Sequence, residues 1–388
     1  MKPPASYLLL SLLVLLGGGA VNCARQFHVC RHCDELLLLG LRAPTYTCGG
    51  NRVLTIHGGG TTQTSIYDPA TNTYAVGPVL GGPVNSGALA FQIPNFGPRA
   101  CQNVLIRGNI SNAAQYYNPG TGQTSNITMS SAFDTGSHVI RYRSDASTRF
   151  LLIPGNTTNT IIYKPDLDLF TAGPDLMIST GGGSHSFELT TGPLAGKFII
   201  PNGAGGANWR VFDPVTETIS AHSTSALGPN SSSSAVRITS GAKNGHHFIA
   251  LGGSNPNNMT YNPATNGFTT VGTVSATQNS GANTFMADAG ALQGQIVIVT
   301  ANGMVVDRYN PASDTVSNSG ITTTAAVNAG GHNFLIGAGQ ESGNRMIVTA
   351  NGTIVNVYRQ ASNSFVAVGG LQLTANAGTG SVSVPIAD

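Results

Sequence analysis

Three histidines at matching positions of an internal repeat are the side chains with the clearest capacity for chemistry. His138, His185 and His332 each stand near the start of a segment expected to be the first strand of its repeat unit. Imidazoles gathered in one place could bind a metal ion or an acidic group. Alternatively, each ring caps the start of its strand by hydrogen bonding to the backbone, which is the simpler interpretation. Which of the two holds depends on how the repeats are arranged.

Five cysteines are the other reactive side chains, and four of them are crowded before the first repeat. In an exported chain disulfides are the expected state, and an odd number leaves one cysteine over. Cys23 is the candidate for an intermolecular bond. In a bacterial source it could instead carry a lipid anchor, although Ala20–Asn22 resemble a lipobox poorly. The remaining four cysteines can pair in three ways that the sequence does not distinguish: Cys30, Cys33, Cys48 and Cys101.

The run from His28 to Cys33 also has the residue types of a zinc site, and Cys48 could add a fourth ligand. The second half of a paired-ligand pattern is missing. We therefore expect no metal and no other cofactor.

Residues 1–20 have the composition of a signal peptide. Lys2 supplies a positive start, Leu8–Leu16 an apolar run, and Gly18–Ala20 a small-residue cleavage zone. The apolar run is too short to span a bilayer. We expect an exported chain without a transmembrane segment, whose mature form begins near Val21 with a Cys-rich arm over residues 21–50.

The elements that must position these residues are seven copies of an aromatic motif. The best preserved copy runs from Tyr261 to Phe268, and successive copies lie 46 to 50 residues apart. A period of this length is typical of solenoids and propellers. A single domain over residues 51–388 accounts for all copies, whose first residues are Tyr67, Tyr117, Tyr163, Phe212, Tyr261, Tyr309 and Tyr358.

Each repeat is expected to form four antiparallel strands. In one copy the β-branched run Ile296–Val299 fits a buried strand, and Asn302-Gly303 fits the centre of a two-residue type I′ turn. Met304–Tyr309 then returns, and Asn310–Asp314 forms a second turn before the outer strand. The glycines of the equivalent turns are hairpin residues rather than a phosphate cradle, because no helix is expected to follow them.

The two ends of the repeat region are expected to meet. The region starts at Arg52–Ile56 with what is elsewhere a second strand, and it finishes at Ser381–Ile386 with what is elsewhere a first strand. The C-terminal strand should therefore complete the N-terminal blade and hide two sheet edges. The predicted fold is an all-β, seven-bladed β-propeller of four-stranded antiparallel blades.

The pattern resembles the kelch-type β-propeller repeat, which occurs in kelch proteins and in the central domain of galactose-oxidase-like enzymes. The resemblance covers about residues 51–388 and rests on an apolar strand, a Gly turn, a Tyr-Asp/Asn-Pro-x-Thr/Ser turn and a following aromatic residue. The double Gly is intact only in the first and fifth copies. The usual blade Trp is lost or replaced by Tyr74, Phe170, Phe268 and Phe365.

The resemblance has two implications for function. First strands line the central channel of such propellers, so His138, His185 and His332 would gather near one channel mouth. An oxidase of this family would need a copper site with two His, two Tyr and a Cys cross-linked to one Tyr. His246-His247 fit only superficially, since they begin a second strand, and Cys101 is more simply a disulfide partner. The enzymes also carry a further domain after the propeller, and this chain stops at the closing strand.

The amino-acid composition excludes several functional classes. Charged residues make up 9% of the chain, against about 25% in ordinary soluble domains. The 18 Lys and Arg residues are spread thinly and the formal net charge is +2, which argues against nucleic acid. The 16 carboxylates include no marked acid pair, and the single Trp209 excludes the repeated Trp box of sialidase propellers.

Asn-x-Ser/Thr sequons are as frequent as chance would produce, but their placement is informative. Three of them fall in the expected turn between the second and third strands, which would be exposed. In a eukaryotic source we expect several to be glycosylated among Asn109, Asn126, Asn156, Asn230, Asn258 and Asn351.

Together these features favour a secreted, non-catalytic propeller that serves as an extracellular structural or interaction module. Its N-terminal arm could link copies into a polymeric surface assembly, so protein partners or self-association are expected and glycans are possible ligands. The alternative is a galactose-oxidase-like or other carbohydrate-active propeller enzyme, or a lectin-like glycan-binding module.

Overall fold

The computed structural model describes Cys48 and residues 51–144, 147–231, 233–276, 278, 282–301, 303–329, 331–371, 374 and 380–383. The chain divides into two units, Met1–Cys48 and Gly49–Asp388, and nearly all described residues belong to the second. The expected signal peptide and most of the expected arm, including Cys23, Cys30 and Cys33, lie outside the described residues.

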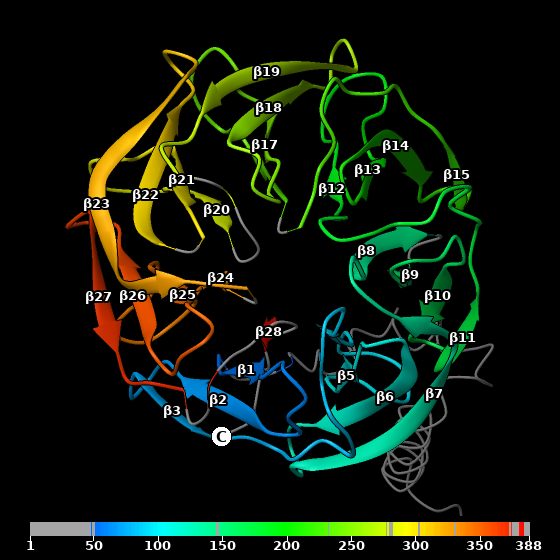
Figure 1. Ribbon diagram of the computed structural model, residues 1–388. Helices are drawn as coiled ribbons and strands as arrows, with labels where there is room; N and C mark the ends of the chain where they lie inside the picture. Colours follow the sequence, from blue (N-terminus) through cyan, green and yellow to red (C-terminus); the bar gives the residue numbers. More distant parts are fainter. Residues whose placement is uncertain are drawn as a thin grey trace, which may run out of the picture. The chain divides into compact units, whose positions relative to one another are not determined.

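The second unit is a seven-bladed β-propeller (Figure 1). Its strands form seven four-stranded antiparallel sheets, numbered here as blades 1 to 7 in chain order. Within each blade the strands run in sequence from the centre of the ring to its rim. The predicted all-β class and the blade count are confirmed. Among the described residues, no helix is long and apolar enough to cross a membrane.

The two inner strands of every blade follow the expected segments. From blade 1 to blade 7 the first strands are β28 (Gly380–Ser383), β4 (Leu89–Gln92), β8 (His138–Ser144), β12 (Phe187–Glu188), β16 (Ser234–Arg237), β20 (Asn283–Met286) and β24 (His332–Leu335). The second strands are β1 (Val53–Ile56), β5 (Asn103–Ile106), β9 (Ser147–Ile153), β13 (Phe198–Gly203), β17 (His247–Ala250), β21 (Ile296–Val299) and β25 (Arg345–Val348).

The two outer strands carry the repeated motif between them. The third strands are β2 (Thr64–Asp68), β6 (Ser111–Asn118), β10 (Ile161–Lys164), β14 (Gly206–Asp213), β18 (Asn257–Asn262), β22 (Gly303–Asn310) and β26 (Val355–Arg359). The outer strands are β3 (Thr73–Val76), β7 (Gln123–Phe133), β11 (Leu169–Ala172), β15 (Thr218–Ala221), β19 (Gly267–Thr273), β23 (Thr315–Val327) and β27 (Ser364–Val368).

The ring closes through its two ends, as predicted. The C-terminal strand β28 pairs antiparallel with β1, and the register runs from Val53 opposite Ser383 to Ile56 opposite Gly380. Blade 1 is thus built from both ends of the repeat region. This pairing satisfies backbone groups of β1 that would otherwise form an open sheet edge.

Neighbouring blades share their apolar cores. One core joins Phe91 and Tyr116 of blade 2 with Phe150 and Tyr163 of blade 3, and the rings of Phe91 and Phe150 lie 4.6 Å apart. Burying one such aromatic side chain stabilises the fold by about 2 to 3 kcal/mol. The second strands are β-branched because they are covered on both faces, and all four residues of β21 are buried.

The turn between third and outer strands explains the repeated motif. Five residues after the leading aromatic, every blade places a residue with a left-handed backbone, and we call this position the turn residue. In blade 1 it is Asn72 (φ 55°), whose Oδ1 accepts a hydrogen bond of 2.8 Å from the Tyr67 hydroxyl. The same bond recurs in blades 3, 5, 6 and 7, from Tyr163 to Asp168, Tyr261 to Asn266, Tyr309 to Asp314 and Tyr358 to Asn363.

The expected two-residue turn between second and third strands is wrong in most blades, because residues 57–63, 107–110, 154–160, 251–256 and 349–354 separate these strands in blades 1, 2, 3, 5 and 7. In blade 7 the left-handed residues are Ala350 (φ 54°) and Asn351 (φ 50°), not the Asn351-Gly352 pair. In blade 6 the corresponding Asn302 lies outside the described residues.

Candidate functional site

The three candidate histidines lie on three different blades. His138 and His185 belong to adjacent blades 3 and 4, and His185 is close enough to lower the pKa of His138. His332 begins β24 of blade 7, on the other side of the ring from β8 and β12 (Figure 1). Among the described residues, no three His, Cys, Asp or Glu side chains are grouped so that they could hold a metal ion.

The pairing between first and second strands identifies the residues of other blades that are equivalent to these histidines. His138 pairs with Ile153 and His332 with Val348. In blade 5 the equivalent residue is Ser234, opposite Ala250. The Ser234 hydroxyl lies 2.7 Å from that of Thr284 in blade 6.

Backbone capping accounts for one nitrogen of each ring in the adjacent pair. Nδ1 of His138 donates to the Gly136 carbonyl at 3.0 Å, and Nδ1 of His185 donates to the Gly183 carbonyl at 2.9 Å. A carbonyl can only accept, so in the neutral rings the proton is on Nδ1 and Nε2 carries the lone pair. Both Nε2 atoms are buried and have no hydrogen-bond partner among the described residues.

The electrostatics of the pair disfavour an acidic ligand. Burial, followed by the nearby His185, lowers the pKa of His138 to about 4. Burial also lowers the pKa of His185 to about 4. Both rings are therefore neutral near pH 7, and a neutral imidazole with a free lone pair has no charge to offer a carboxylate.

A second set of contacts joins each blade to the next at the opposite end of the first strands. The loop between first and second strands contains a glycine with positive φ that lies against the next blade's motif turn. A Cβ added at Gly97 would come within 2.1 Å of the Pro165 carbonyl oxygen, and one at Gly290 within 1.7 Å of that of Gln360. The equivalent approaches are Gly192 to Pro263, Gly241 to Pro311 and Gly339 to Pro69.

The residue two positions after this glycine, which we call the loop residue, matches the turn residue of the next blade. Where the turn residue is an acid, the loop residue is a cation: Nε of Arg99 lies 3.0 Å from Asp168, and Nζ of Lys243 lies 2.7 Å from Asp314. Where it is Asn266 or Asn363, the loop residue is Leu194 or Leu292, packed in the apolar core of that blade. At these four junctions an acidic turn residue therefore faces a cationic loop residue, and a neutral turn residue faces an apolar one.

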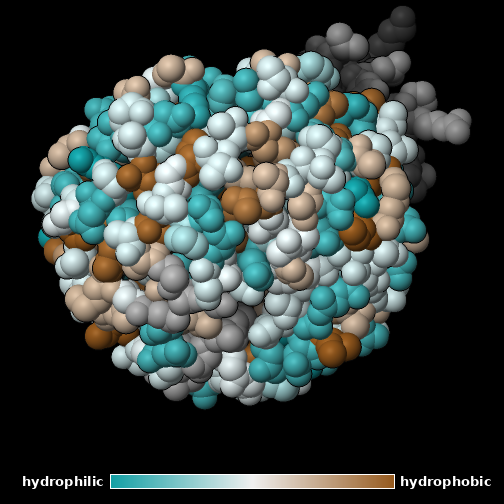
Figure 2. Space-filling view, turned by 45° about the horizontal axis from the view of Figure 1, so that its top comes forward, coloured by the Kyte–Doolittle hydropathy of each residue, from teal (hydrophilic) through white to brown (hydrophobic). Residues whose placement is uncertain are grey.

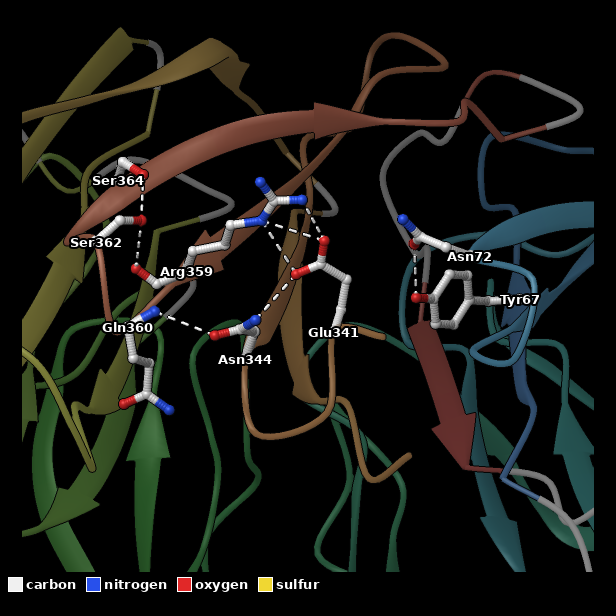
Figure 3. A network of polar contacts seen from close by, with 8 residues as sticks. All are labelled: Tyr67, Asn72, Glu341, Asn344, Arg359, Gln360, Ser362 and Ser364. Carbon is white, nitrogen blue, oxygen red and sulfur yellow. Dashed lines mark hydrogen bonds and ion pairs between the residues drawn. The ribbon is translucent and has the colours of Figure 1, made fainter. Parts of the chain in front are cut away.

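In blade 7 the loop residue is the buried Glu341. Its carboxylate accepts a pair of hydrogen bonds from Arg359 on β26 and one of 2.9 Å from Nδ2 of Asn344 (Figure 3). These donors, Arg359 foremost, lower the pKa of Glu341. Figure 3 shows the carboxylate between Arg359 and the Tyr67–Asn72 turn of blade 1. Burial, followed by the charge of Glu341, raises the pKa of Tyr67 to about 12.

Gln360 explains why the last copy of the motif departs from the consensus. It stands where other copies have proline, and its Oε1 accepts hydrogen bonds from the backbone N–H of Asp288 at 2.6 Å and of Ala289 at 3.1 Å in blade 6. Its own N–H donates to Asn344 at 3.1 Å. A proline has neither group, so the substitution adds inter-blade bonds.

Blade 3 has no such loop. Ser144 at the end of β8 pairs directly with Ser147 at the start of β9, whereas in blade 5 residues 238–246 separate the same strands. The turn residue of blade 4, Glu217, is instead held by strand residues: the Tyr142 hydroxyl donates to it at 2.7 Å, and Arg149 forms an ion pair with it.

The missing loop leaves a pocket between blades 3 and 4. Its volume is about 560 Å³. The residues around it come from β8 and β9 of blade 3 and from β12, β13, the inter-strand loop and the motif turn of blade 4: Arg141, Tyr142, Arg143, Thr148, Glu188, Gly196, Phe198, Pro214 and Val215. Val215 is 81% exposed, which is unusual for a large apolar side chain in this molecule.

Sequence reasoning missed this pocket, although a signal was present. The step from Tyr117 to Tyr163 is 46 residues, shorter than any other step in the repeat region. That interval contains the inner strands of blade 3, where the loop is absent. A shortened repeat was therefore the sequence sign of an unfilled junction.

A second cavity, of about 550 Å³, lies between blades 4 and 5. It is lined mainly by small residues and backbone, with Leu227 and Asn230 as its larger side chains. It contains no charged side chain, so it offers little chemistry beyond that of an amide.

Two of the candidate cysteines are described, and both are disulfide-bonded: Cys48 and Cys101. Cys101 has a left-handed backbone (φ 61°). The equivalent loop position holds a glycine in blades 4 to 7, with φ of 80°, 87°, 75° and 83° at Gly196, Gly245, Gly294 and Gly343. A side chain at this position is costly, by roughly 1 to 2 kcal/mol, so Cys101 is retained against the backbone preference.

The sequons divide by exposure. The side chains of Asn109, Asn126, Asn156 and Asn351 are exposed, and Asn230 is half-buried against the second cavity. Asn258 is fully buried, and its Oδ1 accepts a bond of 2.6 Å from Gln278. The structure does not support a glycan at Asn258, because a sugar there would displace the core of blade 5.

His247 and Cys101, which superficially fit a copper site, are packed in the blade and disulfide-bonded, respectively. His247 is buried on β17, and its ring lies 4.5 Å from that of Phe187. Cys101 is in a disulfide and so has no free sulfur to bond to a tyrosine ring. These contacts give no geometric support to the oxidase alternative.

Comparisons with known proteins show similarity in fold and nothing about function. No family and no curated protein matches the sequence. A functionally unknown protein from Desulfotomaculum acetoxidans is similar in structure, with a TM-score of 0.53 and 11% identity over 86% of this chain and 99% of that one. Apo AztD from Citrobacter koseri has a TM-score of 0.49, with 7% identity over 85% and 97%. BBS1N in complex with ARL6DN also scores 0.49, with 14% identity over 83% and 89%.

Proposed function

We propose that this protein is a secreted, non-catalytic β-propeller of the kelch type that serves as an extracellular structural or interaction module. The observation that carries the proposal is Cys101, a disulfide-bonded residue at a backbone position where four other blades use glycine. Disulfides persist in oxidising compartments outside the cytosol. The composition of residues 1–20, typical of a signal peptide, supports the same destination.

The surface supports an interaction role rather than a catalytic one. Hydrophilic and hydrophobic side chains are intermixed over the face in Figure 2, in keeping with a chain in which only 9% of residues are charged. Such a surface has few charges to desolvate when it is covered by a partner. We further propose that the N-terminal arm, residues 21–50, links copies into a polymeric surface assembly through Cys23.

Secretion and assembly can be tested together. The full chain is expressed with its own N-terminus in an exporting host, and the mature end is identified by mass spectrometry. Native electrophoresis and electron microscopy with and without reductant then report the assembly. We expect an end near Val21 and oligomers that reductant dissociates. A Cys23→Ser variant should fold and be exported but lose the disulfide-linked species.

Retention of the whole chain in the cytoplasm, or a strictly monomeric species under both redox conditions, would overturn the proposal. Copper analysis and a peroxide assay with sugars address the catalytic alternative. Stoichiometric copper with peroxide release would make the protein an enzyme.

A further inference from the structure

The pocket between blades 3 and 4 is a vacant copy of a junction that five other blades fill with their own chain. In blades 2, 4, 5, 6 and 7 the inter-strand loop covers the next blade's motif turn and delivers one side chain beside it. Blade 3 turns back directly from Ser144 to Ser147, and beside the pocket the motif turn of blade 4 contributes the buried Pro214 and the exposed Val215. The pocket thus lies where the other five blades place an inter-strand loop.

The charges around the vacancy differ from those at the filled junctions. Arg141 and Arg143 are both exposed and alternate with the buried Tyr142 on β8, so their side chains project from the same face of the strand. Neither forms an ion pair or hydrogen bond with a described residue. At the filled junctions, by contrast, the cations Arg99 and Lys243 are paired with Asp168 and Asp314.

The other residues that line the pocket indicate which further groups a bound ligand needs. Among the described residues that line the pocket, Glu188 is the one acid beside the two arginines, so this lining carries a net positive charge. Val215 and Phe198 add apolar surface, and the turn residue Glu217 is already satisfied by Tyr142 and Arg149. An occupant therefore needs a carboxylate for the arginines and an apolar group for Val215, but no cation for the turn.

We propose that this pocket binds an acidic peptide loop of a partner protein, seated as the missing inter-strand loop would be. A loop that carries an acid has a precedent in the same chain, because the blade 7 loop places Glu341 against Arg359. Guanidinium groups bind carboxylates in a paired, directional geometry, which favours a fixed register for the loop. The inference rests on the proposed interaction function and names the surface and the partner chemistry.

A peptide copied from the blade 7 loop is the direct probe. Residues 337–344, Gly-Ala-Gly-Gln-Glu-Ser-Gly-Asn, are synthesised with blocked ends, together with a control in which the glutamate is glutamine. Binding to the full chain is followed by ligand-observed NMR titration at low and high salt. We expect the glutamate peptide to bind at least about fivefold more tightly than the glutamine control, a difference of about 1 kcal/mol, and salt to weaken it.

Protein variants localise the site. Arg141→Ser with Arg143→Ser should abolish the preference for the glutamate peptide. Grafting residues 241–246 between Ser144 and Ser147 should block binding altogether, because the pocket is then filled. Thermal unfolding confirms that each variant is folded. A Lys pair at positions 141 and 143 should keep most of the salt-dependent binding.

Three outcomes would overturn the inference. They are absence of binding at millimolar peptide, equal binding of the two peptides, and unchanged binding to the double serine variant. Binding of an acidic oligosaccharide without binding of the peptide would also reject a protein loop as the occupant. If one of these outcomes is found while the wild-type chain is secreted and assembles as proposed, the inference fails alone and the proposed function stands.

Discussion

Nε of Arg99 in blade 2 lies 3.0 Å from Oδ2 of Asp168 in blade 3, across the junction of two blades. Asp168 has a left-handed backbone at φ 50°, and its Oδ1 also accepts a hydrogen bond of 2.6 Å from the Tyr116 hydroxyl. The equivalent pair in blades 4 and 5 is Leu194 with Asn266, which has no charge. The junction between a loop residue and the turn residue of the next blade is therefore formed either by an ion pair or by an uncharged pair.

The first prediction concerns replacing the ion pair of Arg99 and Asp168 by the uncharged pair that blades 4 and 5 use. Arg99→Leu alone leaves Asp168 without its cation, and Asp168→Asn alone leaves the cation without its acid. Each change should lower the free energy of unfolding by about 1 kcal/mol, because a charge-assisted hydrogen bond is lost. The double variant recreates the uncharged pair and should lose clearly less than the sum, as measured by urea unfolding in a double-mutant cycle.

Leu194→Arg is the matched control, since it places a cation opposite the neutral Asn266 and should not be rescued by any change at Asp168. Strict additivity of the Arg99 and Asp168 effects would show that the two residues are not coupled.

The second prediction concerns Cys101. With reductant present, Cys101→Gly should be more stable than Cys101→Ser by about 1 kcal/mol, because only glycine relieves the left-handed backbone. Without reductant, wild type should be the most stable of the three, since both variants lose the disulfide. Chemical denaturation of the full chain under each condition gives the comparison. Equal stability of the Gly and Ser variants in reductant would argue against backbone strain at this position.

The third prediction separates the sequons. After expression in a glycosylating host, glycopeptide mass spectrometry should find sugar at one or more of the exposed Asn109, Asn126, Asn156 and Asn351, and none at the buried Asn258. Asn258→Gln should lower the free energy of unfolding by about 1 to 3 kcal/mol, because the bond to Gln278 is broken inside the core. Asn351→Gln, on the surface, should change it little. Occupied Asn258 in folded protein would contradict the buried position.

The fourth prediction tests closure of the ring. Deleting residues 380–388 removes β28 and exposes the backbone edge of β1. An exposed edge strand promotes pairing with other molecules, so the truncated chain should aggregate and melt at a lower temperature. Size-exclusion chromatography with light scattering and thermal unfolding report the two effects. A truncated chain that stays monomeric with an unchanged melting temperature would show that β28 does not close the ring.

The fifth prediction is a pH dependence of stability. Burial lowers the pKa of His138, His185 and His247 from the usual 6.5 to about 4. Between these values the unfolded chain binds protons that the folded chain does not, so folding stability is complete above about pH 6.5 and is lost as the pH falls toward 4. The loss should reach at least about 2 kcal/mol by pH 5.

Urea unfolding at pH 7, 6 and 5 measures this change in a range where most carboxylates remain ionised. The His138→Gln/His185→Gln variant should show a smaller loss between pH 7 and pH 5 than wild type. An identical pH profile would mean that these rings do not resist protonation.

Much of the fold followed from the sequence because the repeat is local. A left-handed residue five positions after the aromatic residue makes a tight turn in all seven blades, and in five of them the tyrosine hydroxyl binds its side chain, as in Tyr67 and Asn72. The seven turns give the blade count. The offset between the first and last strands likewise indicated closure of β28 on β1. Both features depend on residues that are close in sequence or on a simple count.

Other features were decided only by tertiary structure, because they depend on which segments meet across blades. His138 and His332 share a repeat position, yet the ring places them in blades 3 and 7 rather than side by side. Asn258 and Asn351 carry the same sequon, but burial separates them. The vacancy beside Arg141 and Arg143 arises because blade 3 lacks a loop that its neighbours fold onto the next blade. Sequence spacing determined the blades, and packing between blades determined which surface is left open for a partner.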